Sequence, residues 1–348
     1  MKVLFLSHHC CIRVVKQSLA LRQAGVEVIH LQHRIANPDS AFLVGNHHFY
    51  KHNVGLEFVL KDRFHDIDLI HVHNEPHILA TIARKVRPDI PIVFDAHDLD
   101  TARTRREHEE EAEAIRSVDG IVTPSQGYND HCRDWYRLDE DYPIITLYSY
   151  CNKAMIDSVQ KRARVRIPGI VYEGGLGITT VQQKKLGMYS YRDWRDAATT
   201  MTKQGIPMHF YGADPDSVSN YIATGAVLHY TMPFTDMMCE LSRYDWGLVG
   251  STKPDHAFEW AMPNKLFEYM AAGVPPIVLN CQEAAQFVIE HGVGMVVKDL
   301  GEIPGIYDRH EKCRWNVSQK KYDFTMEKQM PMLLDFYDKV IERKRNGS

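Results

Sequence analysis

The segment Pro263-Asn-Lys-Leu-Phe-Glu-Tyr-Met-Ala-Ala-Gly-Val-Pro-Pro-Ile-Val-Leu-Asn280 has the pattern of a short helix, a stop and a buried strand. Asn264 is a typical N-cap residue, and Gly273 suits the left-handed position just after a helix. Pro275 and Pro276 forbid further helix, and the short apolar run after them is typical of a buried strand. A helix that leads directly into a buried strand is the unit from which α/β domains are built.

The same helix carries charged side chains outside its apolar face. At about 100° per residue, Leu266, Phe267 and Met270 share one face, and Glu268 lies off it on the side of Lys265. One interpretation is a solvated charged face on an ordinary amphipathic helix, which periodicity alone favours. The other is a ligand site, because a carboxylate suits a pair of sugar hydroxyls and an ammonium near a helix N-terminus suits a phosphate.

Composition and charge narrow the class of protein. The 348 residues predict two domains, and 44% hydrophobic with 25% charged residues is ordinary for a globular chain. A formal net charge of −4 argues against binding through bulk positive charge, so we predict no nucleic-acid partner. Seven cysteines without a Cys-x-x-Cys pair fit a reducing, cytoplasmic location. No stretch is long enough to span a bilayer, although peripheral membrane contact stays open.

Strand and helix patterns alternate through two series. Residues 1–150 form the first series and residues 165–321 the second, whereas residues 150–168 are polar and basic and are predicted to connect the two domains. Residues 322–345 are predicted to form a final amphipathic helix. Alternation of this kind predicts an α/β fold of two Rossmann-like, doubly wound parallel sheets.

Ligands on such sheets bind at the carboxyl ends of the strands. His97 and Asp98 follow a buried strand there, so His97 is either a loop histidine bonded to backbone or a polar group against a bound sugar. No Gly-x-Gly-x-x-Gly follows the first strand, and no Walker-type motif occurs. Gly174 and Gly175 follow a strand of the second series and would let backbone approach a diphosphate.

Histidines are abundant, and three of them raise the question of a metal. Strand spacing puts His71 and His73 on one face, with His77 close behind in the sequence. None has an adjacent carboxylate or cysteine set with ligand-type spacing. We therefore predict no metal site.

Five segments in order carry a family resemblance. The chain resembles the GT-B-fold retaining glycosyltransferases of family 4, also called glycosyl transferases group 1, which use nucleotide-sugar donors and face two Rossmann-like domains across a cleft. The segments are Asp68–Pro76, Pro91–Asp98, Ser117–Ser125, Tyr244–Val249 and Pro263–Pro275.

The resemblance assigns roles to residues of the second series. It implies that Glu268 accepts hydrogen bonds from the donor ribose hydroxyls. It places Asn264 and Lys265 near the donor diphosphate, and Gly174 and Gly175 along its border.

The resemblance also assigns catalysis to the first series. It implies that His97 contacts the donor sugar and the charge that develops at its anomeric centre, and it makes Asp98 a second catalytic candidate. A further cation after the glycine turn would bind the diphosphate, and Lys184, Lys185 and Arg192 are the candidates.

The implied function is retaining transfer of a sugar from a UDP- or GDP-sugar to a hydroxyl of a glycan, lipid or small molecule, as in polysaccharide biosynthesis. No metal or other cofactor is implied. Residues 1–150 would bind the acceptor and residues 165–321 the donor, with the helix at 322–345 packed back on the first domain.

One departure from the family pattern keeps two alternatives open. Trp260 stands where many members carry a second glutamate, eight residues before the one matching Glu268. This departure is compatible with an atypical donor or with a non-catalytic nucleotide-sugar-binding or scaffold protein. The other alternative is a non-hydrolysing nucleotide-sugar epimerase, with Glu75, Asp95 and Asp98 as acid and base groups.

Overall fold

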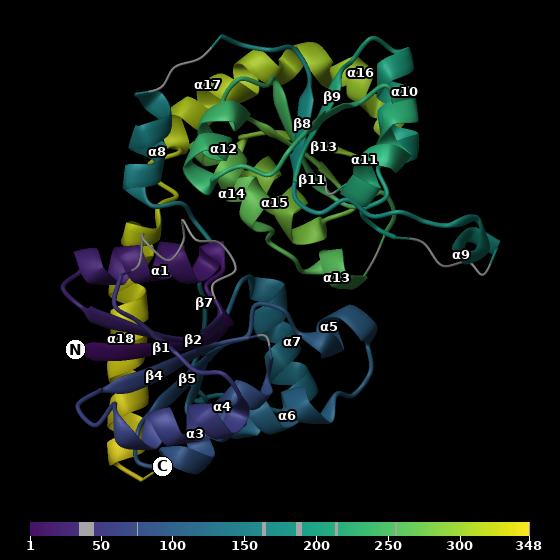
Figure 1. The fold of residues 1–348 in the computed structure, drawn as a ribbon. Coiled ribbons are helices and arrows are strands. Elements are labelled where there is room, and N and C mark those ends of the chain that lie inside the picture. The colour runs from purple at the N-terminus through teal and green to yellow at the C-terminus, as the bar shows by residue number, and fades with distance from the viewer. Residues whose placement is uncertain are drawn as a thin grey trace. The chain divides into compact units, whose positions relative to one another are not determined.

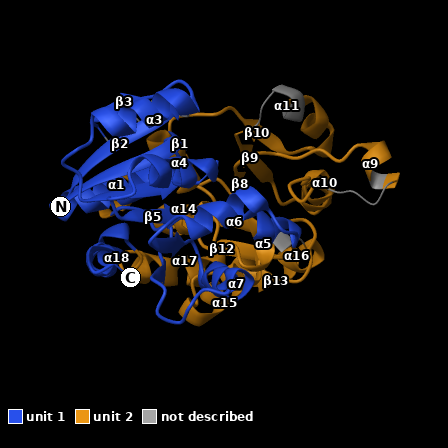
Figure 2. Ribbon diagram, turned by 90° about the horizontal axis from the view of Figure 1, so that it is seen from below, with its two compact units in different colours: residues 1–152, 325–348 blue, residues 153–324 orange. Residues whose placement is uncertain are grey.

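A computed structural model of the chain divides into two compact units, which Figure 2 shows in different colours. Unit 1 comprises residues 1–152 and 325–348, and unit 2 comprises residues 153–324. The residues that the structure describes are 1–34, 45–74, 76–161, 165–185, 190–212, 215–254 and 256–347.

Unit 1 is a parallel sheet with helices along the chain between its strands (Figure 1). Its strands are β1 (Lys2–His9), β2 (Glu27–Arg34), β3 (His47–Phe49), β4 (Leu69–His73), β5 (Ile92–Asp95), β6 (Gly120–Thr123) and β7 (Ile144–Thr146). Its helices are α1 (Ile12–Gln23), α3 (Asn53–Asp62), α4 (Ile78–Val86), α5 (Asp100–Thr104), α6 (Glu109–Arg116), α7 (Gln126–Tyr136) and α18 (Met326–Arg345).

The strand order in unit 1 is β3-β2-β1-β4-β5-β6-β7, and every neighbouring pair is parallel. The central strands β4 and β5 are buried along their whole length, as expected for a sheet covered on both faces. The order of the strands reverses between β1 and β4. Such a topological switch point is where doubly wound sheets bind ligands, and the loops after β1, β4 and β5 lie at this edge of the sheet.

The C-terminal helix α18 is part of unit 1, where it packs against α1 and β5. The chain leaves and re-enters this unit at one point, because the Met326 amide donates to the Cys151 carbonyl at 3.2 Å. Gly120 of β6 lies directly under α18: a Cβ there would be 2.7 Å from Val340 Cγ2 and 2.9 Å from Phe336 Cζ. The close approach of helix and sheet therefore requires glycine at this position.

Substituting Gly120→Ala should destabilise the protein by about 1–3 kcal/mol, because the added methyl overpacks the contact with α18. Gly55→Ala in α3 is the control, since a Cβ there meets no atom within 4 Å and should be neutral or stabilising by up to about 1 kcal/mol. Denaturant-induced unfolding of both variants measures the difference. Equal unfolding midpoints would contradict the tight packing of α18 on β6.

Unit 2 repeats the architecture with a six-stranded sheet. Its strands are β8 (Ile170–Glu173), β9 (Met208–Tyr211), β10 (Val227–His229), β11 (Trp246–Gly250), β12 (Pro276–Leu279) and β13 (Met295–Val297). Its α-helices are α8 (Lys153–Gln160), α9 (Val181–Lys185), α10 (Arg195–Lys203), α11 (Pro215–Tyr221), α12 (Phe234–Leu241), α13 (His256–Glu259), α14 (Asn264–Ala271), α15 (Gln282–His291), α16 (Ile303–Ile306) and α17 (His310–Lys320). Short 3-10 turns are η1 (Ile222–Thr224), η2 (Leu300–Glu302) and η3 (Tyr307–Arg309).

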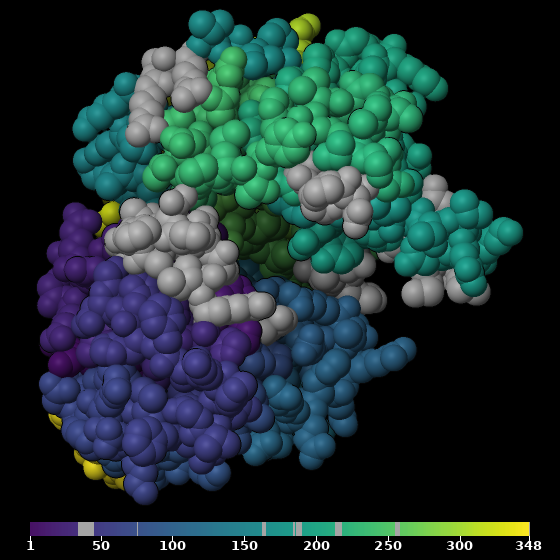
Figure 3. Space-filling model, viewed as in Figure 1, coloured from purple at the N-terminus to yellow at the C-terminus, as the bar shows by residue number. Residues whose placement is uncertain are grey.

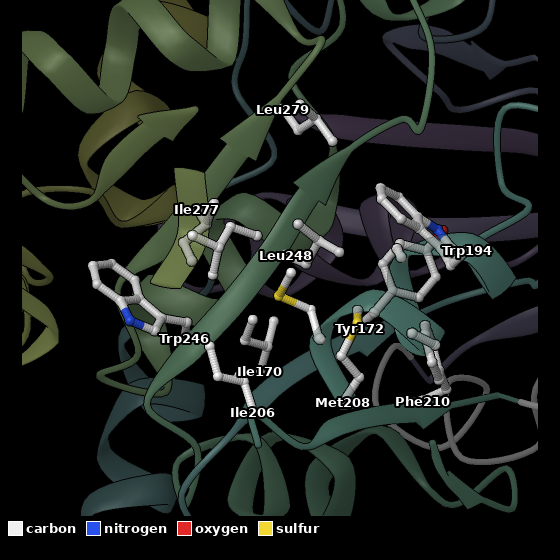
Figure 4. Packing of buried hydrophobic residues seen from close by; sticks show 14 of the residues in the cluster. Ile170, Tyr172, Trp194, Ile206, Met208, Phe210, Trp246, Leu248, Ile277 and Leu279 are labelled. Atoms are coloured by element: carbon white, nitrogen blue, oxygen red, sulfur yellow. The ribbon is translucent and has the colours of Figure 1, made fainter. Parts of the chain in front are cut away.

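The strand order in unit 2 is β10-β9-β8-β11-β12-β13, again parallel throughout, and it reverses between β8 and β11. Figure 4 shows the hydrophobic core on one face of this sheet. Tyr172 of β8 contacts Trp194 and Phe210 at ring-centroid distances of 5.2 and 6.0 Å. This aromatic packing fixes the end of β8, from which the loop with Gly174 begins.

The predicted fold class of two Rossmann-like α/β domains is confirmed, because both sheets are parallel, interleaved with helices and doubly wound. Residues 150–168, predicted to connect the domains, contain the boundary between the two units after residue 152 and then form helix α8. Met155, Ile156 and Val159 give α8 a buried face against α12 and α14, which the polar composition of the segment concealed. The last helix begins at Met326, four residues later than predicted.

Residues 263–280 fold into the predicted helix and strand, apart from the residue at which the helix begins. Helix α14 begins at Asn264 with Pro263 as its N-cap residue, so Asn264 is the first helical residue and not the cap. Gly273 has a φ of +77° just after the helix, in the conformation that favours glycine. Among the described residues, no helix combines the length and apolar character needed to cross a membrane.

Candidate functional site

In unit 2, the N-terminus of α14 meets the end of β8 beside the topological switch point. The Lys265 ammonium donates to the Glu173 carbonyl at 2.7 Å and lies 3.6 Å from the centroid of the Tyr172 ring. Gly174 follows with a φ of +115°, and a Cβ there would be 3.3 Å from Lys265 Nζ. Because Gly174 has no side chain, its backbone and the Lys265 ammonium lie close together with nothing between them. This arrangement is suited to binding an anion.

Glu268 lies one turn further along α14, three residues after Lys265 and so on the same side of the helix. Its side chain is only 4% exposed, which does not fit a solvated charged face. The helix is held close to the sheet at this level. The Glu173 amide donates to the Tyr269 hydroxyl at 3.0 Å, and a Cβ on Gly247 would be 2.3 Å from the Tyr269 ring.

The other predicted donor-site residues are distributed unevenly. Asn264 is half-buried in the first turn of α14. Gly175 lies beside Arg192, because its Cβ would be 3.4 Å from a guanidinium nitrogen, and that guanidinium lies 5.1 Å from the Tyr191 ring. Arg192 is thus the predicted cation that the structure brings to the glycine turn.

Lys185 is not brought to this group by any contact described in the structure. It is exposed on α9, which projects from the body of unit 2 (Figures 1 and 3). The side chain of Lys184 lies outside the described part of the chain.

In unit 1, His97 follows β5 in a loop that Asn74 fixes. The Asn74 side chain accepts from the His97 amide at 3.1 Å and donates to the Asp98 carbonyl at 2.6 Å. Its own amide donates to the Asp95 carbonyl at 3.3 Å. The loop after β5 is therefore clamped to the loop after β4, and the His97 backbone is positioned from both.

The His97 side chain belongs to a buried polar cluster centred on Asp95, which is 0% exposed. Asp95 accepts from Arg13 Nε at 2.9 and 3.0 Å, from Gln17 Nε2 at 2.6 Å and from His97 Nδ1 at 3.2 Å. Arg13 also donates to the Leu147 carbonyl at 2.9 Å. His97 is therefore not a loop histidine bonded only to backbone, because a buried carboxylate orients its ring.

The charges in this cluster are set by competition between burial and pairing. Burial would raise the pKa of Asp95, but the charge of Arg13 and the hydrogen bond from His97 hold that pKa well below its usual value. Burial would lower the pKa of His97, but Asp95 and Cys11 raise it to about 10. Asp95 is thus ionised and His97 cationic at neutral pH.

Sequence reasoning missed Arg13 and Gln17 entirely, and it considered Asp95 only as an epimerase acid or base. One available signal was the position of Arg13 in the first turn of a helix that follows β1, at the edge where ligands bind. Asp98, the second catalytic candidate, pairs with Arg103 at 2.5 Å and is 45% exposed. Glu75, the other epimerase candidate, lies outside the described residues.

Two clusters have ligand atoms close enough together to raise the question of a metal ion. In the first, His71, His73 and Asp95 converge, but Asp95 is already engaged by Arg13, Gln17 and His97, as described above. His71 Nδ1 is 2.6 Å from the Tyr337 hydroxyl. Burial lowers the pKa of His71 to about 4 and holds that of His73 well below its usual value, so the cationic form of both rings is disfavoured.

In the second cluster, His77 Nε2 is 3.3 Å from Asp100 Oδ2 and 3.4 Å from Glu111 Oε2. Glu111 already accepts from the Asp100 amide and from the hydroxyls of Thr101 and Tyr136. A donating His77 ring accounts for the remaining contacts without an ion. Neither cluster therefore leads us to assign a metal.

Comparison with protein-family models matches each half of the chain. Residues 13–145 match the model Glycosyltransferase Family 4, and residues 188–325 match the model Glucosyltransferase 3-like, C-terminal domain. No curated protein sequence matches the chain.

Solved structures match nearly the whole length. An α-glucosyltransferase in complex with UDP and a 13-mer DNA is 12% identical with a TM-score of 0.67, covering 97% of this chain and 99% of that one. HepE from Anabaena, in complex with UDP and glucose, is 13% identical with a TM-score of 0.69, covering 96% and 99%. A glycosyltransferase from Rickettsia africae is 12% identical with a TM-score of 0.61, covering 98% of each chain. At these identities the matches establish the fold, which is GT-B as predicted.

The prediction that nucleic acid is not a partner is wrong. The matching α-glucosyltransferase structure contains a 13-mer DNA, so this fold does not exclude DNA binding. The prediction rested on the formal net charge of −4. Net charge describes the whole chain, whereas phosphate contacts depend on local groups of basic side chains, and one does not determine the other.

Proposed function

We propose that this chain, a glycosyltransferase of the group 1, family 4-like class, transfers a sugar from a UDP-sugar to an acceptor hydroxyl with retention of configuration. Unit 2 binds the donor and unit 1 the acceptor. The observation that carries the proposal is the α14 terminus in unit 2, where Lys265 Nζ lies 2.7 Å from the carbonyl of Glu173 and beside Gly174. An ammonium, glycine backbone and a helix N-terminus together suit a diphosphate.

The donor roles follow from this geometry. Lys265 and the helix N-terminus bind the diphosphate, with Arg192 as the second cation near Gly175. We assign the ribose hydroxyls to Glu268, because it lies on the same side of α14 as Lys265 and a carboxylate can accept hydrogen bonds from a pair of hydroxyls. UDP is the favoured nucleotide because matching structures of this fold contain UDP or UDP-glucose.

The transfer step is electrostatic in character. As the sugar–phosphate bond breaks, negative charge accumulates on the departing diphosphate, and cations fixed in advance stabilise it. In a retaining reaction the acceptor hydroxyl approaches from the face that the diphosphate leaves, and a diphosphate oxygen takes its proton. The chain's own cations neutralise the diphosphate in this proposal, and no step is assigned to a metal.

Calorimetric titration with UDP and GDP tests the donor assignment. We expect UDP to bind, and Lys265→Ala to weaken it by about 10- to 100-fold, the effect of losing one charge-assisted hydrogen bond. Lys203→Ala removes an exposed lysine of α10 in the same unit and should leave UDP affinity unchanged. Absence of UDP binding at millimolar concentration would reject the proposal, and GDP binding alone would reject the nucleotide.

A panel of UDP-sugars then tests the reaction. Incubation with candidate acceptors, including glycans, lipids and hydroxymethylated DNA, should release UDP, and NMR of the product should show the anomeric configuration of the donor. An inverted product would contradict retention. UDP binding without turnover on any acceptor or water would favour a non-catalytic binding protein.

A further inference from the structure

Gln17 is a polar residue of α1 that is completely buried. It is 0% exposed, and its Nε2 donates to Asp95 Oδ2 at 2.6 Å. Within the described part of the chain, Gln17 Oε1 has no protein donor, so the contact with Asp95 orients the amide. A buried amide that is paired at one end only is unfavourable for stability, and an apolar side chain of the same length would avoid this penalty. A role other than stability therefore has to account for Gln17.

The position of Gln17 on α1 brings it to the same carboxylate as Arg13. The two residues are four apart, so their side chains leave the same face of the helix. Arg13 Nε is 3.0 Å from Asp95 Oδ1 and 2.9 Å from Oδ2, so the two oxygens share it almost equally. A shared donor resists rotation of the carboxylate only weakly, since rotation shortens one distance as it lengthens the other. Gln17 binds Oδ2 alone and therefore sets the rotation.

The rotation of the Asp95 carboxylate determines how the His97 ring is oriented. His97 Nδ1 donates at 3.2 Å to Asp95 Oδ1, the oxygen that Gln17 does not bind. A carboxylate only accepts hydrogen bonds, so Nδ1 is the donor, and Nε2 on the opposite side of the ring is directed away from Asp95. The His97 side chain keeps 15% exposure, so the ring can be reached from outside the buried cluster.

The backbone at His97 is fixed without any contribution from Gln17. Asn74 Oδ1 accepts from the His97 amide at 3.1 Å, and Asn74 Nδ2 donates to the Asp98 carbonyl at 2.6 Å. These bonds hold the loop after β5, whereas the contact with Asp95 holds the ring. Loss of the Gln17 donor should therefore change the orientation of the ring and leave the loop in place.

We propose that Gln17 is a positioning residue for His97 in the sugar transfer and acts through Asp95. Gln17 sets the rotation of the carboxylate, and the carboxylate sets the orientation in which the imidazole meets the substrate. This inference rests on the proposed function, because it assigns Gln17 a role in that reaction. Since the diphosphate is assigned to unit 2, loss of the Gln17 donor should lower kcat and leave the affinity for UDP unchanged.

Gln17→Met tests the proposal, because methionine has a similar length and no donor. We expect kcat to fall about 10- to 100-fold, the effect of a misplaced catalytic group, with UDP affinity unchanged. The unfolding midpoint should stay close to that of the native protein, since the substitution also removes the buried Oε1. Gln23→Met is the matched control, because Gln23 is exposed at the end of the same helix and its loss should leave kcat unchanged.

A double variant separates positioning from a general effect on the fold. In the His97→Ala background there is no ring left to orient, so adding Gln17→Met should not lower kcat further. A second loss of similar size in this background would overturn the proposal. A Gln17→Met enzyme with the native kcat would overturn it as well.

NMR of protein with isotope-labelled histidine reports on the ring without any assay of transfer. The resonance that His97→Ala removes identifies His97, and Gln17→Met should shift this resonance whereas Gln23→Met should not. An unshifted His97 resonance in Gln17→Met would contradict the inference even if the enzyme is active. A shifted resonance in a protein that transfers no sugar would reject the proposed function and retain the control of the His97 ring by Gln17.

Discussion

Replacing Asp95 by alanine should lower the free energy of unfolding by about 3–5 kcal/mol, the range for removing one partner of a buried ion pair. Asp95 is 0% exposed and its partner Arg13 is 2% exposed. Without the carboxylate, the Arg13 guanidinium remains buried with the Leu147 carbonyl as its other described acceptor. Gln17 also loses its acceptor, so the variant leaves buried polar groups of α1 without partners.

Denaturant-induced unfolding measures this effect. Asp66→Ala is the control, because Asp66 pairs with Lys2 at 2.7 Å but its side chain is 74% exposed, and its loss should leave the unfolding midpoint nearly unchanged. Asp95→Asn should lie between the two, since the amide oxygen still accepts from Gln17 while the charge is lost. An Asp95→Ala midpoint equal to that of Asp66→Ala would show that the buried pair does not support the fold.

The sequence was sufficient for the fold because alternating strands and helices leave a local signature. Most strands of the two sheets contain a short apolar run, with β3 (His47–Phe49) as an exception, and the intervening helices are near them in the sequence, so both series of Rossmann-like elements could be recognised. Helix α8 escaped recognition because its buried face consists of Met155, Ile156 and Val159 inside a polar stretch. Three apolar residues are too few to predict a buried helix face from the sequence, and their burial is explained only by the contacts of α8 with α12 and α14.

The candidate sites were partly predictable, for a similar reason. Residues at strand ends, such as His97 and Gly174, could be selected because parallel strands deliver their ends to one edge. Their partners could not, since Arg13 is 82 residues from Asp95 and Lys265 is 92 residues from Glu173. Contacts between residues so far apart in the sequence depend on which helix packs against which strand. The net charge gave a wrong prediction about nucleic acid for a related reason: it sums over the whole chain and does not show where basic side chains are grouped.

Replacing His97 by alanine should reduce kcat for sugar transfer about 10²- to 10³-fold, the loss that follows removal of one preorganised donor of an active site. The pKa of His97 is raised to about 10 by Asp95 and Cys11 against the effect of burial, so the ring is a cation at neutral pH. A cation is unfavourable beside the positive charge that develops on the sugar but favourable beside the departing diphosphate. We therefore expect His97 to act as a cationic hydrogen-bond donor and not as a general base.

The pH profile distinguishes this role from a general base. A base with an ordinary histidine pKa would give a rate that rises with pH near 6.5. A cationic donor whose pKa is raised gives a rate that is constant through neutrality and falls as pH rises through about 10, where the proton is lost. His97→Ala should lack that alkaline fall, whereas His65→Ala, an exposed histidine of unit 1, should retain both the native rate and the fall. A native profile that rises around pH 6.5, or full activity in His97→Ala, would remove His97 from the catalytic machinery.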